Sequence, residues 1–279
     1  DGIILGAGEQ PGLAPAVIKF PVTMSSSQSA TLNILPGQLL EKPGMERLLG
    51  AMTPEPGEPA SSFYLKAGAL PGFLATKRQE DHGWRERLAR LDSNVLDSET
   101  GLAGFRKGSE AVVILPPFPL VQDHLSADWD VGPLLSLLET EYLSGVVLLR
   151  LGRYAVAVYQ GEKLLSSKTD TRYVKGRHAA GGTSQKRFQR IREGQIRRIY
   201  DKTCLVVKAQ FSPHLDQLEF VFLGGDRFTL NGLIKVCPLL ERLKPITLSR
   251  RLNIRDPKHD TLAGVGPMLR QSRVYPISW

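Results

Sequence analysis

One long, basic helical pattern constrains the fold of this chain more than any other stretch. Residues 183–211 are expected to form a single helix, which Thr183 or Ser184 would cap at its start. A loop with three glycines, residues 175–183, precedes it and permits close backbone approach to a ligand. The apolar positions recur at close to helical spacing, at Phe188, Ile191, Ile196, Ile199, Leu205 and Val206.

The other faces of this predicted helix are strongly basic. Between Lys175 and Lys202 there are nine Lys and Arg residues against two acids, Glu193 and Asp201, while the whole chain has a net charge of +8. The basicity behind the sequence pI of about 9.5 is therefore almost all local. Charge runs are usually solvated faces held by Glu–Lys pairs, but this run has too few acids for that. It instead predicts a surface that binds phosphate groups of nucleic acid.

Length and composition limit the remaining possibilities. A chain of 279 residues with 42% apolar content is expected to build one large or two ordinary domains. No apolar run approaches the length of a membrane span, so no membrane partner is expected, and the start of the chain lacks a secretory pattern. Cys204 and Cys237 lie outside any metal-ligand spacing, which predicts two buried free thiols in a reducing cytosol and no metal.

The order of elements predicts an α+β protein. Residues 1–130 are expected to form a small N-terminal α+β domain with no catalytic constellation, with strands at 16–22, 30–35 and 109–115, helices at 44–51 and 77–96, and a linker at 53–62. For residues 131–255 we predict a mixed sheet covered by helices. The expected elements are a helix at 132–143, strands at 146–151, 153–159 and 163–174, the long helix, a strand at 218–223, helices at 228–236 and 239–243, and a strand at 246–249. Residues 256–279 form a tail, whose Arg270, Arg273, Tyr275 and Trp279 suit either a further RNA contact or an edge strand on the N-terminal domain.

Gln185, at the start of the helix, carries the sharpest chemical hypothesis. A neutral carboxamide both donates and accepts hydrogen bonds, so it can position a water molecule but cannot act as a strong base. Backbone N–H groups at the helix start would help to stabilise an oxyanion. The plain alternative is a flexible connection with a capping residue. His178 has no partner triad that would make it a base, and Phe188 and Tyr200 are expected in the core rather than stacked on bases.

A resemblance sharpens this picture. Residues from about 131 to 255 resemble the central domain of the eukaryotic and archaeal class I peptide release factors. They are more similar still to the release-factor-like, VLRF-type peptidyl-tRNA hydrolases of ribosome-associated quality control and to their bacterial relatives. The likeness is carried by the run GPLLSLLETEYLSGVVLLRLGRYAVAVYQGEKL, by Gly182-Thr183-Ser184-Gln185 and by the basic helix. True release factors have Gly-Gly-Gln contiguously, whereas Thr183 and Ser184 here fit the GxxQ form of the quality-control relatives.

The resemblance implies a ribonuclease H-like, mixed-sheet catalytic domain and a peptidyl-tRNA hydrolase for ribosome rescue. Its glutamine would support hydrolysis of the peptidyl-tRNA ester at the peptidyl-transferase centre. Large ribosomal subunit, peptidyl-tRNA and rRNA would be the partners of a cytoplasmic monomer without a cofactor. The expected catalytic residues are Gln185, Gly182, Thr183 and Ser184, and the expected RNA-binding residues are Lys175, Arg177, His178, Lys186, Arg187, Arg190, Arg197 and Arg198.

Two other functions stay open. One is a non-catalytic ribosome- or RNA-binding factor that uses the same basic helix while Gln185 does nothing. The other is a divalent-metal nuclease built on Asp170, Glu193 and Asp226, although these acids have no metal-ligand spacing.

Overall fold

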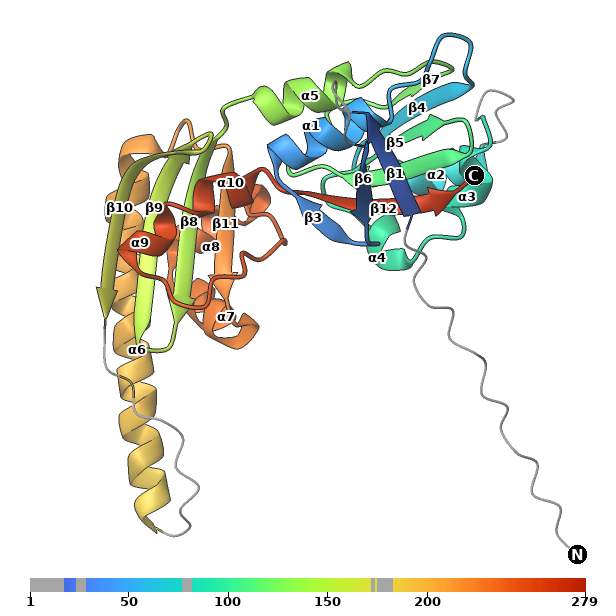
Figure 1. Cartoon of the computed structure of the whole chain (residues 1–279). Helices are drawn as coiled ribbons and strands as arrows, with labels where there is room; N and C mark the ends of the chain where they lie inside the picture. Colours follow the sequence, from blue (N-terminus) through green and yellow to red (C-terminus); the bar gives the residue numbers. More distant parts are fainter. Residues whose placement is uncertain (1–17, 24–28, 77–81, 172–173, 175–182) are drawn as a thin grey trace, which may run out of the picture. The chain divides into compact units, whose positions relative to one another are not determined.

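A computed structural model describes residues 18–23, 29–76, 82–171, 174 and 183–279, and the chain divides into two compact units (Figure 1). The first unit combines residues 1–134 with residues 272–279, and the second comprises residues 135–271. Each unit has its own sheet and its own helices, which confirms the α+β class. Residues 256–271 therefore belong with the second unit, and the last strand of the chain belongs with the first.

The first unit is built on a six-stranded sheet in which all neighbours are antiparallel. Its strands, in spatial order, are β3 (Gln38–Leu40), β12 (Ser272–Ser278), β6 (Glu110–Leu115), β5 (Leu102–Lys107), β4 (Ala60–Leu65) and β7 (His124–Ser126). A separate antiparallel pair is formed by β1 (Ile18–Thr23) and β2 (Ser29–Ile34). The last strand of the chain thus pairs on both sides, with β3 and with β6, rather than lying at an edge.

Aromatic side chains dominate the core of the first unit. The buried Trp84 ring packs edge-on against Phe63 and against Trp279, with 4.7 Å between ring centroids in each pair. The indole N–H of Trp84 donates to the Ser61 hydroxyl at 3.1 Å, which satisfies its one polar group. The helices of this part of the chain are α1 (Lys42–Ala51), α2 (Leu70–Ala75), α3 (Trp84–Leu88), α4 (Ser93–Leu96) and α5 (Gly132–Glu139), which leads into the second unit.

The second unit contains a four-stranded mixed sheet in the order β10-β9-β8-β11. Its bounds are β8 (Leu143–Arg150), β9 (Arg153–Gln160), β10 (Lys163–Thr171) and β11 (Phe220–Gly225). The first three strands form an antiparallel meander and β11 pairs parallel to β8, so the predicted meander and mixed sheet are confirmed. Gly152 and Gly161, at positive φ, make the two tight turns of the meander.

Helices bury both faces of β8 and β9. On one face, alternate residues such as Val147 and Val156 pack with the long helix α6 (Thr183–Phe211) and the helices after β11. On the other, the Tyr159 hydroxyl donates to the backbone carbonyl of Leu262, 2.8 Å away in α9. The helices after α6 are η1 (Ser212–His214), α7 (Arg227–Val236), α8 (Pro238–Arg242), η2 (Lys244–Ile246), α9 (His259–Leu262) and α10 (Val265–Leu269).

Several expected elements differ from the observed ones. Residues 246–249, predicted as a strand, lie at the end of η2 and contribute a single bridge between Val221 and Thr247. Pro245 lacks the N–H that a strand ladder needs. In the predicted helix at 77–96, the described part holds two short helices, and Gly83 at φ +83° precedes the first of them. The predicted linker at 53–62 runs into β4.

The tail arginine Arg270 is a structural residue, not a surface contact. Its side chain donates to the carbonyls of Leu138 at 2.7 Å and Thr140 at 3.0 Å, at the carboxyl end of α5, and the residue is only 6% exposed. The Trp279 ring likewise makes contacts within the protein, because the guanidinium groups of Arg87 and Arg106 lie over it. The further RNA contact considered for these two residues is therefore not supported. Within the described residues, no helix is both long and apolar enough to span a membrane.

Candidate functional site

The predicted hydrolytic residues lie at the start of α6. Thr183, Ser184 and Gln185 are its first three residues, so Thr183 and Ser184 are inside the helix rather than at its N-cap. The first four N–H groups of a helix lack partners within the helix, and they carry its positive dipole end. The backbone around Gln185 is thus suited to stabilise negative charge. The loop residues of the prediction, Lys175, Arg177, His178 and Gly182, lie outside the described residues.

The described cations of the site are exposed along the first half of α6. Arg197 alone of the predicted set pairs with an acid among the described residues: its Nε lies 3.1 Å from the Asp201 carboxylate, and both side chains are more than half exposed. Such a pair is worth little in water. Glu193 is bound by Gln189 at 2.9 Å. The exposed cations are Lys186, Arg187, Arg190, Arg197 and Arg198.

This half of α6 projects beyond the sheet. Figure 1 shows the helix running past the ends of β8 and β9, and every residue from Lys186 to Ile191 is exposed. Phe188, predicted to lie in the core, is 41% exposed, and Ile191 is exposed with it. The apolar spacing alone could not reveal this, because it does not show where the sheet beneath the helix ends. The helix begins to be buried at Ile199.

The second half of α6 is packed firmly against the sheet and α7. Ile199, Val207 and Phe211 are fully buried, and the hydroxyl of Thr203 donates to the Ile199 carbonyl at 2.7 Å. Two glycines admit large rings from the helix. A Cβ on Gly145 in β8 would lie 2.6 Å from the Phe211 ring, and one on Gly232 in α7 would lie 2.5 Å from the Tyr200 hydroxyl. Sequence reasoning missed both contacts.

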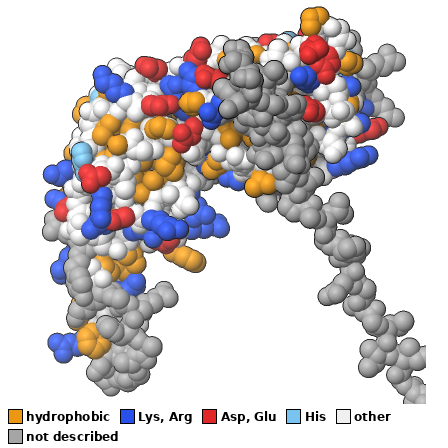
Figure 2. Space-filling view, viewed as in Figure 1, with side chains coloured by type: hydrophobic (Ala, Val, Ile, Leu, Met, Phe, Trp, Pro, Cys, Tyr) orange, Lys and Arg blue, Asp and Glu red, His pale blue; other side chains and the backbone are white. Residues whose placement is uncertain are grey.

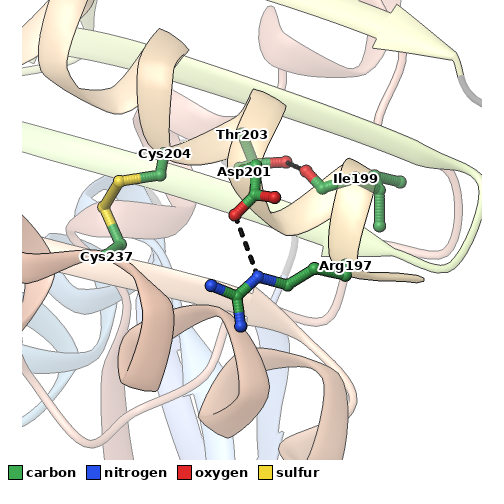
Figure 3. The surroundings of a disulfide bond; sticks show 6 residues. All are labelled: Arg197, Ile199, Asp201, Thr203, Cys204 and Cys237. Atoms are coloured by element: carbon green, nitrogen blue, oxygen red, sulfur yellow. Dashed lines mark hydrogen bonds and ion pairs between the residues drawn. A yellow bond between two sulfur atoms is a disulfide. The ribbon is translucent and has the colours of Figure 1, made fainter. Parts of the chain in front are cut away.

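A disulfide also fastens this half of α6. Cys204 lies one turn after Tyr200, and Cys237 follows the last residue of α7; their Cα atoms are 5.3 Å apart and their sulfurs are bonded (Figure 3). The prediction of two free thiols is therefore wrong. The helices bring together cysteines that are 33 residues apart in the chain, a proximity that sequence spacing does not contain. The disulfide therefore joins the packed half of α6 to the end of α7.

Burial and hydrogen bonding shift the pKa values of two groups near the packed half of α6. Burial raises the pKa of Tyr200, and the nearby Asp226 raises it further. Asp226 itself caps α7, accepting from the backbone N–H of Thr229 at 2.9 Å. Asp170 lies in β10 and Glu193 in α6, so the three acids considered for a metal belong to three separate elements. Among the described residues, no group of three His, Cys, Asp or Glu could hold a metal ion.

Comparison with known proteins assigns this unit. Residues 143–275 match the family model "Actinobacteria/chloroflexi VLRF1 release factor". Residues 143–275 are thus a release-factor-like domain of the VLRF1 type. The matched segment begins with β8, contains all of α6 and extends into β12, so it covers the sheet, the projecting helix and the Gln185 position.

Curated relatives agree with this assignment. The chain is 30% identical over 109 residues to "Peptide chain release factor subunit 1" of Archaeoglobus fulgidus, and 32% identical over 111 residues to the protein of that name from Methanosphaera stadtmanae. These alignments cover 39% and 40% of this chain but only 27% of each relative. The chain thus spans about a quarter of the length of these relatives.

Two solved structures are also similar to it at low TM-scores. "Crystal structure of archaeal translation termination factor, aRF1" gives a TM-score of 0.34 at 16% identity and covers 82% of this chain and 72% of its own. "Vms1 mitochondrial localization core" gives 0.40 at 13% identity, with coverage of 77% and 91%. The assignment rests on the sequence matches and not on these two structures.

Proposed function

We propose that this VLRF1-type protein hydrolyses the ester of peptidyl-tRNA on stalled large ribosomal subunits, as a cytoplasmic ribosome-rescue factor. One observation carries the proposal: the segment that matches the release-factor family places Gln185 at the start of a helix whose first half is exposed, cationic and extended beyond its sheet. A rod of this kind is suited to carry a small reactive loop into an RNA-lined site.

In the proposed reaction, the Gln185 carboxamide orients a water molecule against the ester carbonyl carbon. The water oxygen forms the new bond, and backbone N–H groups at Gly182–Ser184 stabilise the oxyanion of the tetrahedral intermediate. The bond to the tRNA 3′ oxygen then breaks, and the proton released from the water neutralises that oxygen. Acceleration comes from positioning and electrostatics, because a carboxamide is not a base. The ribosome completes the site, so activity on free peptidyl-tRNA is expected to be low.

Affinity in this proposal comes from phosphate contacts. Lys186, Arg187 and Arg190 stand nearest to Gln185 on the helix and are exposed. The loop residues Lys175, Arg177 and His178, and the helix cations Arg197 and Arg198, would extend the contact to rRNA and the tRNA acceptor stem. Each phosphate contact makes binding weaker as salt rises. The protein acts as a monomer without a cofactor.

A peptide-release assay on stalled 50S–peptidyl-tRNA complexes tests the proposal. Wild type should release the labelled peptide, and Gln185→Ala should bind the complex equally but release it at least tenfold more slowly. Equal release by both proteins, or binding without release by both, would show a non-catalytic RNA-binding factor instead. RNA cleavage that a chelator blocks would show a nuclease.

A further inference from the structure

A polar pocket lies in the second unit, and none of its lining residues belongs to α6. It forms where the parallel strands β8 and β11 end, and its volume is about 270 Å³. Crevices at the carboxyl ends of parallel strands are common ligand sites. Its lining residues are Arg150, Gly225, Arg251, Leu252, Asn253 and Ile254.

Two exposed arginines give the pocket a positive charge. Arg150 donates from Nε to the Ile254 carbonyl at 3.3 Å, which fixes the stem of its guanidinium at the pocket. Neither Arg150 nor Arg251 pairs with an acid among the described residues. The neighbouring Arg250 differs, because its guanidinium donates to the carbonyls of Leu269 and Gln271 and so has a structural role.

A glycine at the end of β11, Gly225, lines the pocket. Gly225 has φ +133°, and a Cβ there would collide with the Leu149 carbonyl. Next to it is Asp226, whose carboxylate is engaged as the α7 cap through Thr229. Burial alone would raise the pKa of Asp226, but hydrogen bonds from Thr229 outweigh it and hold the pKa below its usual value. That charge is therefore directed into the helix end.

An exposed aromatic residue follows the pocket residue Gly225 closely in the chain. Phe228 lies three residues after Gly225, in the first turn of α7, and is 89% exposed. Exposing a whole phenyl ring to water has no benefit for folding. Exposed rings next to arginines are typical of surfaces that bind single-stranded nucleic acid, where a base stacks on the ring.

This pocket lies at the same edge of the sheet as the projecting half of α6. β8, β10 and β11 all point the same way, because β9 is antiparallel to its two neighbours and β11 is parallel to β8. Figure 1 shows α6 extending past that edge, and Figure 2 shows Lys and Arg side chains on the lower part of this unit. An RNA that binds the projecting half of α6 would therefore also lie close to this pocket.

We propose that Arg150 and Arg251 bind a backbone phosphate of single-stranded RNA while Phe228 stacks on an adjacent unpaired base. The inference rests on the proposed function in one respect, since that function brings RNA to this edge. RNA is favoured over a protein partner because a protein would bury Phe228 in an apolar setting, whereas the pocket that Gly225 lines, three residues before Phe228, is polar and cationic. The strand would belong to a loop of the large-subunit rRNA or to the unpaired end of a tRNA.

Fluorescence anisotropy with a labelled single-stranded oligoribonucleotide tests this site. This RNA carries no peptidyl ester, so binding is measured without hydrolysis, and a matched duplex is run in parallel. Phe228→Ala should weaken single-strand binding about five- to hundredfold, spare the duplex and be rescued by Phe228→Tyr. Replacing Arg150 and Arg251 with Ala should lower the slope of log Kd against log salt by about one.

Lys163→Ala is the control, because Lys163 is an exposed cation at the start of β10, the opposite end of the same sheet. It should change neither the affinity nor the salt slope. Unchanged affinity in a folded Arg150→Ala/Arg251→Ala/Phe228→Ala protein would overturn the proposal. Competition with deacylated tRNA or with 50S subunits distinguishes the two RNA sources. A hydrolase failure would leave this assay unaffected, since binding does not depend on ester cleavage.

Discussion

The Phe211 ring lies directly over Gly145, where a Cβ would come within 2.6 Å of it. Gly145 is in the middle of the sheet, paired with Val158 of β9 and Val221 of β11. Phe211 is the last residue of α6 and is fully buried. This contact fixes the buried carboxyl end of α6, and Gln185 lies at the other end of the same helix. Packing in the core therefore helps to set the position of the proposed site.

Replacing Gly145 with alanine should destabilise the second unit. The added methyl overpacks a site flanked by strands on both sides, which costs about 1–3 kcal/mol. Urea unfolding followed by circular dichroism measures the loss. A Phe211→Leu change in the same protein opens space for the methyl, so the double variant should lose less than the sum of the two single losses. Strict additivity would show that the two residues are not coupled.

Gly194 should respond in the opposite direction. It lies within the exposed part of α6, and a Cβ there would meet nothing within 4 Å. Gly194→Ala should therefore stabilise the helix by about 0.5–1 kcal/mol through helix propensity and a less flexible unfolded chain. Thermal unfolding measures this, and a lower melting temperature would mean that the position needs a glycine for bending or contact.

The disulfide should contribute strongly to stability. Closing a loop between residues 33 apart in sequence, Cys204 and Cys237, stabilises the fold by about 3–4 kcal/mol in the chain-entropy account. Reduction with dithiothreitol should therefore lower the melting temperature of wild type. A Cys204→Ala/Cys237→Ala protein is the control and should be insensitive to reductant. Equal melting temperatures for oxidised and reduced wild type would contradict the expectation.

The α7 cap should make stability depend on pH. Hydrogen bonds from Thr229 overcome the effect of burial and hold the Asp226 pKa below its usual 3.8. Since the folded pKa lies below the unfolded one, the contribution is complete above about pH 5 and is lost as the pH falls through the folded value. Asp226→Ala should cost about 0.5–2 kcal/mol at pH 7.

The measurement for this cap is urea unfolding between pH 3 and pH 7. The gap between wild type and Asp226→Ala should narrow as the pH falls below 4. Asp226→Asn retains an acceptor but does not titrate, so its gap to Asp226→Ala should stay constant. If the difference in unfolding free energy between wild type and Asp226→Ala is also independent of pH, the cap is not a charged carboxylate.

The sequence carried enough information for the meander, α6 and α7, because alternation, turn glycines and helical spacing are local signals. It did not locate β3, β4 or β5, and it left a strand in the tail, observed as β12, as one of two alternatives, since such strands become recognisable only through their partners across the chain. The exposure of Phe188 and the pairing of Cys204 with Cys237 depend likewise on where the sheet ends and how the helices meet. The basic helix was visible at once, whereas the Arg150–Arg251 pocket required β8 and β11 to be placed side by side.

Single-turnover release over a range of protein concentrations on stalled 50S–peptidyl-tRNA complexes tests the central claim most directly. If Gln185 acts on the ester and the α6 cations deliver it, Gln185→Ala should lower the maximal rate at least tenfold and leave the half-saturating concentration unchanged. Lys186→Ala/Arg190→Ala should instead raise the half-saturating concentration and preserve most of the maximal rate. A Gln185→Ala protein that releases peptide at the wild-type maximal rate would contradict the account.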